Sequence, residues 1–305
     1  MKKLLAAVSA TALLISPALA QSQTQPVPAP KPAAKPIKAD PALWVVKDND
    51  TTIYLFGTVH VLRPGVQWFD GGVKKAYDAA REVKLEMVEP AQAEMQELVL
   101  KLALDPGGKP LSAKLGPEIA ALWKKTGTDL GLPVAWFEAM KPWFAATVVS
   151  VAAIEKAGFD SKSGVEKALT VAAKRDGKAL TGFETAEQQL GFFDSLPEPV
   201  QVAFMKSTLQ ELPQAVPMLD AMVANWAKGK PDALAGQLNA ALVSTPEIAK
   251  VLLTDRNTRW AAWIAERMKT PGTLFIAVGA GHLAGKGSVQ DALKPFGLKA
   301  KRIPS

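Results

Sequence analysis

The segment TIYLFGTVH at residues 52–60, together with TLFIAVGAGH at residues 273–282, decides the fold of this 305-residue chain. Each is a short apolar run rich in β-branched and aromatic residues, which predicts a buried strand, and each ends in a Gly-x-x-His motif. The two motifs contain both histidines of the chain, His60 and His282. Because ligands of open α/β sheets bind beyond the carboxyl ends of the strands, we expect both imidazoles at one sheet edge.

The rest of the chain supplies further strands and a long helical section. Strands are predicted at residues 43–46, 82–88, 178–183 and 298–303. Helices are predicted at residues 91–104, 117–125, 143–157, 164–175, 186–195, 197–212, 213–227, 231–242 and 254–268, several of them with proline near the first turn. The expected fold is therefore α/β (α+β), with a mixed central sheet built from N-terminal, middle and C-terminal strands and a large, mostly helical insertion.

The first 20 residues have the composition of a secretory signal. Two lysines, Lys2 and Lys3, precede an apolar zone at residues 4–15, and Ala18-Leu19-Ala20 gives small residues at a cleavage site, with the cut expected after Ala20. The apolar zone is too short for a membrane span, so we expect no stable membrane insertion. The predicted location is periplasmic or secreted.

Residues 21–40 are almost wholly Pro, Ala, Lys, Gln and Ser, which predicts a disordered leader. The folded domain is then expected at residues 41–305. The chain has no cysteine, so this domain has no disulfides, no thiol nucleophile and no thiolate metal ligand.

The charge of the chain does not indicate a nucleic-acid partner. The net charge is +7, but five lysines precede residue 41, and the expected domain carries 31 basic and 28 acidic residues, a balance of +3. No basic stripe with interleaved aromatic residues is present, so we expect no nucleic-acid binding.

The paired histidines are candidates for metal ligands. Neutral imidazole is the commonest metal ligand near neutral pH, and two imidazoles with a carboxylate can form an open site that activates water. Glu86 is the nearest candidate carboxylate, because its predicted strand follows the first motif. Two alternatives remain open, that Glu86 faces solvent on an edge strand and that the histidines only hydrogen-bond the turns.

Three further residues are candidates for chemistry. Glu184 ends the predicted strand at residues 178–183 and is a possible fourth ligand, general base or helix-terminal charge. Arg256 and Asn257 stand at the start of the helix that leads to the second motif. The Arg256 guanidinium could hold a carboxylate or a developing oxyanion, or form a surface ion pair.

The chain resembles the TraB/GumN family, which includes the Tiki metalloproteases. The resemblance rests on residues 54–60 and on the closing run from residue 255 to residue 285, with residues 141–143, 164–166 and 183–189 matching the middle of the family pattern. It implies an α/β core with a helical insertion, as in the erythromycin-esterase and ChaN-like proteins. It also implies a metal-dependent hydrolase. The matched positions are His60, His282, Glu86, Glu184, Arg256 and Asn257, whereas Glu166 stands where the family usually has aspartate.

The expected function is an exported, metal-dependent hydrolase that acts on peptide or amide bonds of a peptide or protein substrate. In this hypothesis His60, His282 and Glu86 hold a divalent ion such as manganese, cobalt or zinc. Glu184 accepts a proton from water, and Arg256 with Asn257 completes the catalytic set. The alternative is a periplasmic protein that binds metal or haem without turnover, so whether the chain is an enzyme stays open.

Overall fold

The computed structural model describes residues 37–242 and 249–305, and its centre is a six-stranded mixed sheet in the order β6-β5-β7-β3-β2-β8. The strands are β2 (Leu43–Lys47), β3 (Thr51–Thr58), β5 (Glu82–Met87), β6 (Ala179–Glu184), β7 (Gly272–Gly279) and β8 (Lys301–Ile303). The four strands β6, β5, β7 and β3 run parallel, and β2 pairs antiparallel with β3 and β8. Strands from both ends and the middle of the chain thus share one sheet, and the predicted fold class is confirmed.

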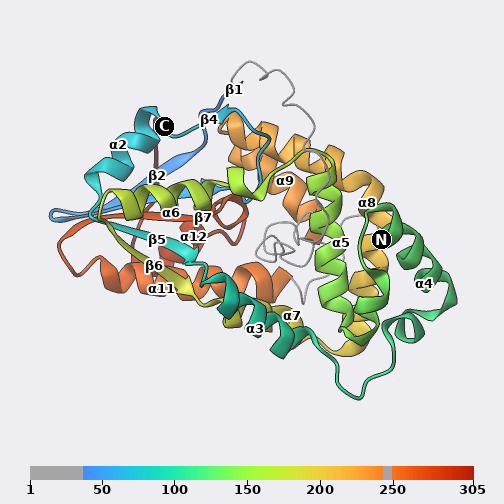
Figure 1. Cartoon of the computed structure of the whole chain (residues 1–305). Coiled ribbons are helices and arrows are strands. Elements are labelled where there is room, and N and C mark those ends of the chain that lie inside the picture. The colour runs from blue at the N-terminus through green and yellow to red at the C-terminus, as the bar shows by residue number, and fades with distance from the viewer. Residues whose placement is uncertain (1–36, 243–248) are drawn as a thin grey trace.

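Helices cover both faces of this sheet (Figure 1). On one face, α2 (Gly71–Ala79) and α6 (Val165–Arg175) bury an apolar cluster that includes Tyr77 and Leu169. On the other face, α11 (Asp255–Arg267) and the short α12 (Val289–Leu293) pack Trp260 and Ile264 against β3 and β7. Because both faces are covered, the central strands are apolar nearly throughout, as buried parallel strands usually are.

The predicted helical insertion forms a helical unit with an apolar core of its own beside the sheet (Figure 1). Its helices are α3 (Gln92–Ala103), α4 (Leu111–Asp129), α5 (Pro142–Lys156), α7 (Ala186–Asp194), α8 (Glu198–Ala227) and α9 (Pro231–Leu242), with the 3₁₀ turn η2 (Val134–Ala139). The apolar helix α5 lies at its centre and packs along α8. None of the helices in the described ranges is long and apolar enough to cross a membrane.

Two details of the predicted helices are wrong. Residues 197–212 and 213–227 were expected to form separate helices, but α8 continues through Pro213 and Pro217, because its apolar residues pack on α5 along its length. Helix α2 was not predicted, because its Gly71-Gly72 start is typical of a loop. Burial of Val73, Ala76 and Tyr77, on one helical face, stabilises it nevertheless.

Ordered structure begins before residue 41. Strand β1 (Ile37–Lys38) pairs with β4 (Val66–Gln67), and the Ala39 and Asp40 amides donate to carbonyls of the folded domain. The expectation of a disordered leader up to residue 40 therefore does not hold for residues 37–40, where the amides of Ile37, Ala39 and Asp40 have partners. The predicted signal peptide and residues 21–36 lie outside the described residues.

Candidate functional site

The candidate site lies at the carboxyl edge of the sheet, where the four parallel strands end. Strands β3 and β7 pair in register from Thr51–Gly272 to Thr58–Gly279, so both Gly-x-x-His motifs leave the sheet side by side. The six residues predicted from sequence all gather here, namely His60, Glu86, Glu184, Arg256, Asn257 and His282. The grouping expected from the strand order is thus present in the structure.

His60 is oriented by a carboxylate behind it. Its Nδ1 lies 2.8 Å from Oε1 of Glu166, and the Thr58 hydroxyl donates to the same oxygen. Burial lowers the pKa of His60, but the carboxylates of Glu166 and Glu86 together more than offset this, and the pKa lies above its ordinary 6.5. With Nδ1 donating to Glu166, the nitrogen left for chemistry is Nε2.

Glu166 reaches His60 because α6 begins against the first motif. Gly164 precedes this helix, and a Cβ on Gly164 would lie 2.2 Å from the His60 carbonyl oxygen, so only glycine fits there. The Val165 amide then donates to the Val59 carbonyl. Close backbone approach at Gly164 thus places Glu166, in the first turn of α6, beside the imidazole.

His282 is oriented by an amide instead of a carboxylate. Its Nδ1 lies 2.6 Å from Oδ1 of Asn257, and Asn257 Nδ2 donates to the Gly287 carbonyl over 2.7 Å, which fixes the direction of the amide. Nδ1 therefore carries the proton, and Nε2 is an acceptor. Burial, reinforced by the Arg256 charge, lowers the pKa of His282 to about 3, so this imidazole is neutral at physiological pH.

Glu86 lies between the motifs as a buried anion. Its Oε1 accepts the Gly279 amide over 2.6 Å and lies 3.5 Å from His282 Nε2, while Oε2 accepts from Arg256 Nη2 over 2.6 Å. Burial alone would raise the pKa of Glu86, but Arg256 and the two imidazoles, with the Gly279 amide, hold it at about 2. The alternative of a solvent-facing Glu86 is therefore wrong.

Arg256 is fully buried at the centre of the site. Its guanidinium donates to Glu184 over 2.9 and 2.7 Å, to Glu86, to the Leu252 carbonyl over 3.1 Å, and to His282 Nε2 over 3.1 Å. A π-helical turn, Lys250–Thr254, directly precedes α11. Such turns often occur at functional sites, and here the turn supplies the Leu252 carbonyl. The alternative of a surface ion pair for Arg256 is therefore wrong.

Glu184 serves as the anchor of this guanidinium. Both of its oxygens accept from Arg256, and Oε2 also accepts from Gln189 over 2.9 Å. A general base needs a free lone pair facing the reacting water. Glu184 is therefore placed to hold Arg256.

The residues that could hold a metal ion surround Gly279. A Cβ added there would lie 2.9 Å from Glu86 Oε1, 3.6 Å from His282 Cδ2 and 3.9 Å from His60 Nε2. Two imidazole nitrogens and a carboxylate suit a divalent ion, and the partners on both Nδ1 atoms are the second contacts that metal-binding histidines usually have. As they stand, however, no three His, Asp or Glu side chains of the described residues form a ready metal cluster, and Arg256 donates to the His282 nitrogen that would ligate.

Comparison with known proteins identifies the family. The model of the TraB/PrgY/gumN family matches residues 42–302, which covers the sheet, the helical unit and every residue of the site. The chain belongs to the TraB/PrgY/gumN family. The family predicted from the two Gly-x-x-His motifs is thus confirmed, and the match extends over nearly the whole folded domain.

Individual relatives are distant. The chain is 24% identical over 189 residues to the uncharacterized protein YbaP of Escherichia coli (strain K12), and equally to that of Shigella flexneri. Each match covers 62% of this TraB/PrgY/gumN chain and 70% of the relative. No solved structure matches the chain.

Sequence reasoning missed the outer residues of the site. Glu166 was noted only as a departure from the family pattern, yet it is the partner of His60 Nδ1. Thr58 and Gln189 lie in the segments that carry the family resemblance but were given no role, although they hold Glu166 and Glu184. The one available signal was position, because Thr58 lies inside the first motif and Gln189 follows Glu184 by five residues.

Proposed function

We propose that this protein is a hydrolase of peptide or amide bonds whose reaction takes place between the two Gly-x-x-His motifs. One observation carries the proposal. Each imidazole has its Nδ1 engaged by a side chain behind it, His60 by Glu166 and His282 by Asn257, which directs both Nε2 atoms toward the Gly279 end of β7. Metal-ligating histidines usually have such a partner on the nitrogen that does not bind the metal.

We further propose that His60 Nε2, His282 Nε2 and a Glu86 oxygen hold a divalent ion such as manganese, cobalt or zinc. When bound, a divalent ion supplies Lewis-acid activation of water and of a substrate carbonyl. Ligation by His282 requires Arg256 Nη1 to give up its 3.1 Å contact with Nε2. The guanidinium retains Glu184 after that change, because its Nε and Nη2 make those contacts.

The remaining roles follow from charge and hydrogen bonding. The Glu166 carboxylate keeps the proton on His60 Nδ1, so that His60 Nε2 presents its lone pair to the ion. The Arg256 Nη1 donor, once free of His282, can bind the developing oxyanion, and Asn257 keeps His282 in the tautomer that presents a lone pair.

Location and partners are part of the same proposal. The composition of residues 1–20 supports export to the periplasm or beyond, where a peptide or protein would be the substrate. The second candidate is a protein that binds metal or haem at these residues without turnover. It is favoured by the deep burial of His282 and Glu86, which leaves little room for a substrate group.

A peptide-library assay tests the proposal. The metal-loaded protein, residues 21–305, is incubated with a mixed library, and new termini are read by mass spectrometry, alongside Glu86→Gln and the matched control Glu82→Gln. Glu82 lies on the same strand at its far end. We expect cleavage that falls about 100-fold or more in Glu86→Gln and stays within about twofold in Glu82→Gln. Metal binding without cleavage of any peptide would favour the second candidate.

A further inference from the structure

The long helix α8 contacts the chain on both sides of His60. Three residues before His60, the Gly57 carbonyl accepts a 2.7 Å hydrogen bond from Trp226 Nε1. Three residues after His60, the Arg63 guanidinium binds both oxygens of Asp220, over 3.1 and 3.0 Å. The first motif is therefore held at two points by one helix of the helical unit, although neither contact touches the imidazole itself.

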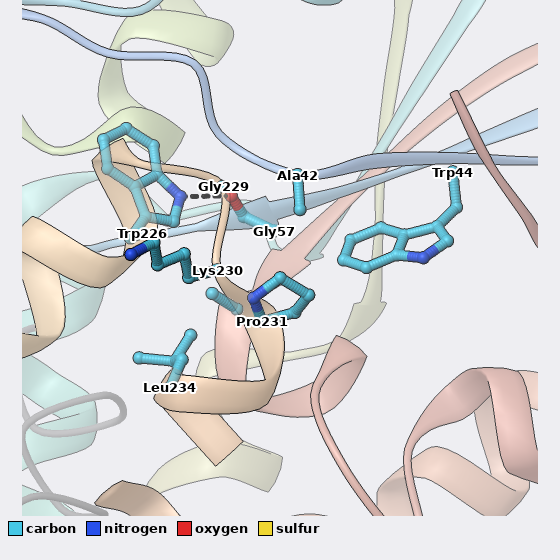
Figure 2. A pocket seen from close by; sticks show the side chains of 9 residues that line it. Ala42, Trp44, Gly57, Trp226, Gly229, Lys230, Pro231 and Leu234 are labelled. Carbon is cyan, nitrogen blue, oxygen red and sulfur yellow. Dashed lines mark hydrogen bonds between the residues drawn. The ribbon is translucent and has the colours of Figure 1, made fainter. Parts of the chain in front are cut away.

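The Trp226 contact lies just beyond the end of the ladder that joins β3 to β2, while β3 is still paired with β7 on its other side. The antiparallel ladder between β2 and β3 ends at the Leu43–Phe56 pair, and Gly57 is the next residue. Trp226 is only 3% exposed, and its N–H gives the Gly57 carbonyl a partner beyond that ladder (Figure 2). A buried carbonyl without a partner is costly, so this hydrogen bond fixes the end of the strand.

Gly57 lies close to the turn of the second motif. A Cβ on Gly57 would lie 3.1 Å from the Cα of Ala280, so the two turns are in close contact. Residues of the α8–α9 junction, Trp226, Pro231 and Leu234, line a small pocket together with Gly57 and Ala280 (Figure 2). The junction thus lies against Gly57 of the first motif and Ala280 of the second.

We propose that Trp226 and Asp220 are positioning residues, which fix His60 by holding Gly57 and Arg63, so that the placement of α8 sets the geometry of the site. The two residues are six positions apart on one helix, about 9 Å along its axis, and α8 is braced by α5. A partner or ligand that shifts α8 would therefore move the His60 imidazole more than the His282 imidazole, whose orientation comes from Asn257. The proposal deepens the proposed function, because it concerns regulation of the same site, but it requires neither metal nor turnover.

Histidine-selective NMR tests this proposal directly, since the chain has two histidines. Protein with ¹³C/¹⁵N-labelled histidine and a tag free of histidine gives two imidazole signals, assigned with His60→Gln. The test variant is Trp226→Phe, and the matched control is Trp143→Phe, because Trp143 is a buried helical tryptophan whose Nε1 has no partner. We expect Trp226→Phe to move or broaden the His60 signal and leave His282 in place, with neither signal changed in Trp143→Phe.

Hydrogen exchange supplies a second reading of the same variants. Loss of one net hydrogen bond corresponds to about fivefold faster exchange of the amides at residues 57–60 in Trp226→Phe. Asp220→Asn serves if Trp226→Phe does not fold, because Asp220 is half exposed and its loss spares the core. An unchanged His60 signal, or equal shifts of both histidines, would overturn the proposal whether or not the protein hydrolyses peptides.

Discussion

Replacement of Arg256 by methionine tests whether its guanidinium holds the buried carboxylates of the site together. The change keeps a long side chain but leaves the Glu86 and Glu184 carboxylates buried without their cation. Removal of one partner of a buried ion pair costs about 3–5 kcal/mol, so the free energy of unfolding at pH 7 should fall by at least that range. For a domain of this size, the loss corresponds to a drop in Tm of about 10 °C.

The penalty of Arg256→Met should also depend on pH. In the native protein, the pKa of Glu86 is about 2, below its ordinary 4.5, so its stabilising contribution is present above pH 4.5 and is lost as the pH falls from 4.5 toward 2. Without Arg256, burial acts with less opposition and raises the pKa of Glu86. Protonation of Glu86 then stabilises the folded variant. The difference in free energy of unfolding between variant and wild type should therefore shrink as the pH is lowered from 7 to 5.

Urea unfolding followed by tryptophan fluorescence measures this effect at both pH values. Arg259→Met is the matched control, because Arg259 lies one turn further along α11 with its side chain 54% exposed and 3.7 Å from Glu184. The control should cost less than about 1 kcal/mol. The reasoning would be refuted by a loss below about 1 kcal/mol in Arg256→Met, or by a loss that is the same at pH 7 and pH 5.

Three further predictions concern the histidines and their neighbours. Gly279→Ala should abolish hydrolysis in a folded protein, because the new Cβ would lie 2.9 Å from Glu86 Oε1 and displace that carboxylate, as activity and circular dichroism would show. Glu166→Gln should lower the pKa of His60 and weaken metal affinity about 10- to 100-fold, measured by NMR titration and calorimetry. In wild type, His282 should stay neutral down to about pH 3 while His60 titrates above 6.5, and a His282 midpoint near 6.5 would contradict its burial.

Controls for these changes come from the same chain. Gly191→Ala pairs with Gly279→Ala, since a Cβ on helical Gly191 meets nothing within 4 Å, and it should leave activity unchanged. Glu187→Gln pairs with Glu166→Gln, because Glu187 is an exposed residue in the first turn of its helix. If Glu166→Gln and Glu187→Gln lost the same metal affinity, the effect would come from the removal of a negative charge in general and not from the His60 contact.

The strands and the grouping of the motifs could be predicted because buried parallel strands have a strong local pattern. The runs before His60 and His282 are continuous apolar segments, and that pattern is sufficient to place two strands and their carboxyl ends. Local sequence was insufficient to predict helices whose formation depends on packing against distant parts of the chain. The helix α8 passes through Pro213 because α5 supports it, and α2 forms around Tyr77 despite its two leading glycines.

The roles within the site could be predicted only in part. Glu86 was identified by its strand, but its anionic state depends on Arg256, which lies 170 residues further along the chain. Glu184 was expected to be a candidate base, whereas the structure gives both of its oxygens to Arg256. Likewise, the partnership of Glu166 with His60 depends on the close approach of Gly164 to a carbonyl, which no pattern within either segment encodes.

Metal content is the measurement that tests the central claim most directly, namely that the two Gly-x-x-His motifs form one site. Protein covering residues 21–305 is equilibrated with manganese, cobalt or zinc in turn, desalted, and analysed by elemental mass spectrometry, alongside His60→Gln and His282→Gln. We predict near-stoichiometric metal in wild type and a large loss in each variant, since both imidazoles and the Glu86 carboxylate lie around Gly279. Equal and low metal in all three proteins, or a loss in one variant alone, would contradict a shared metal site.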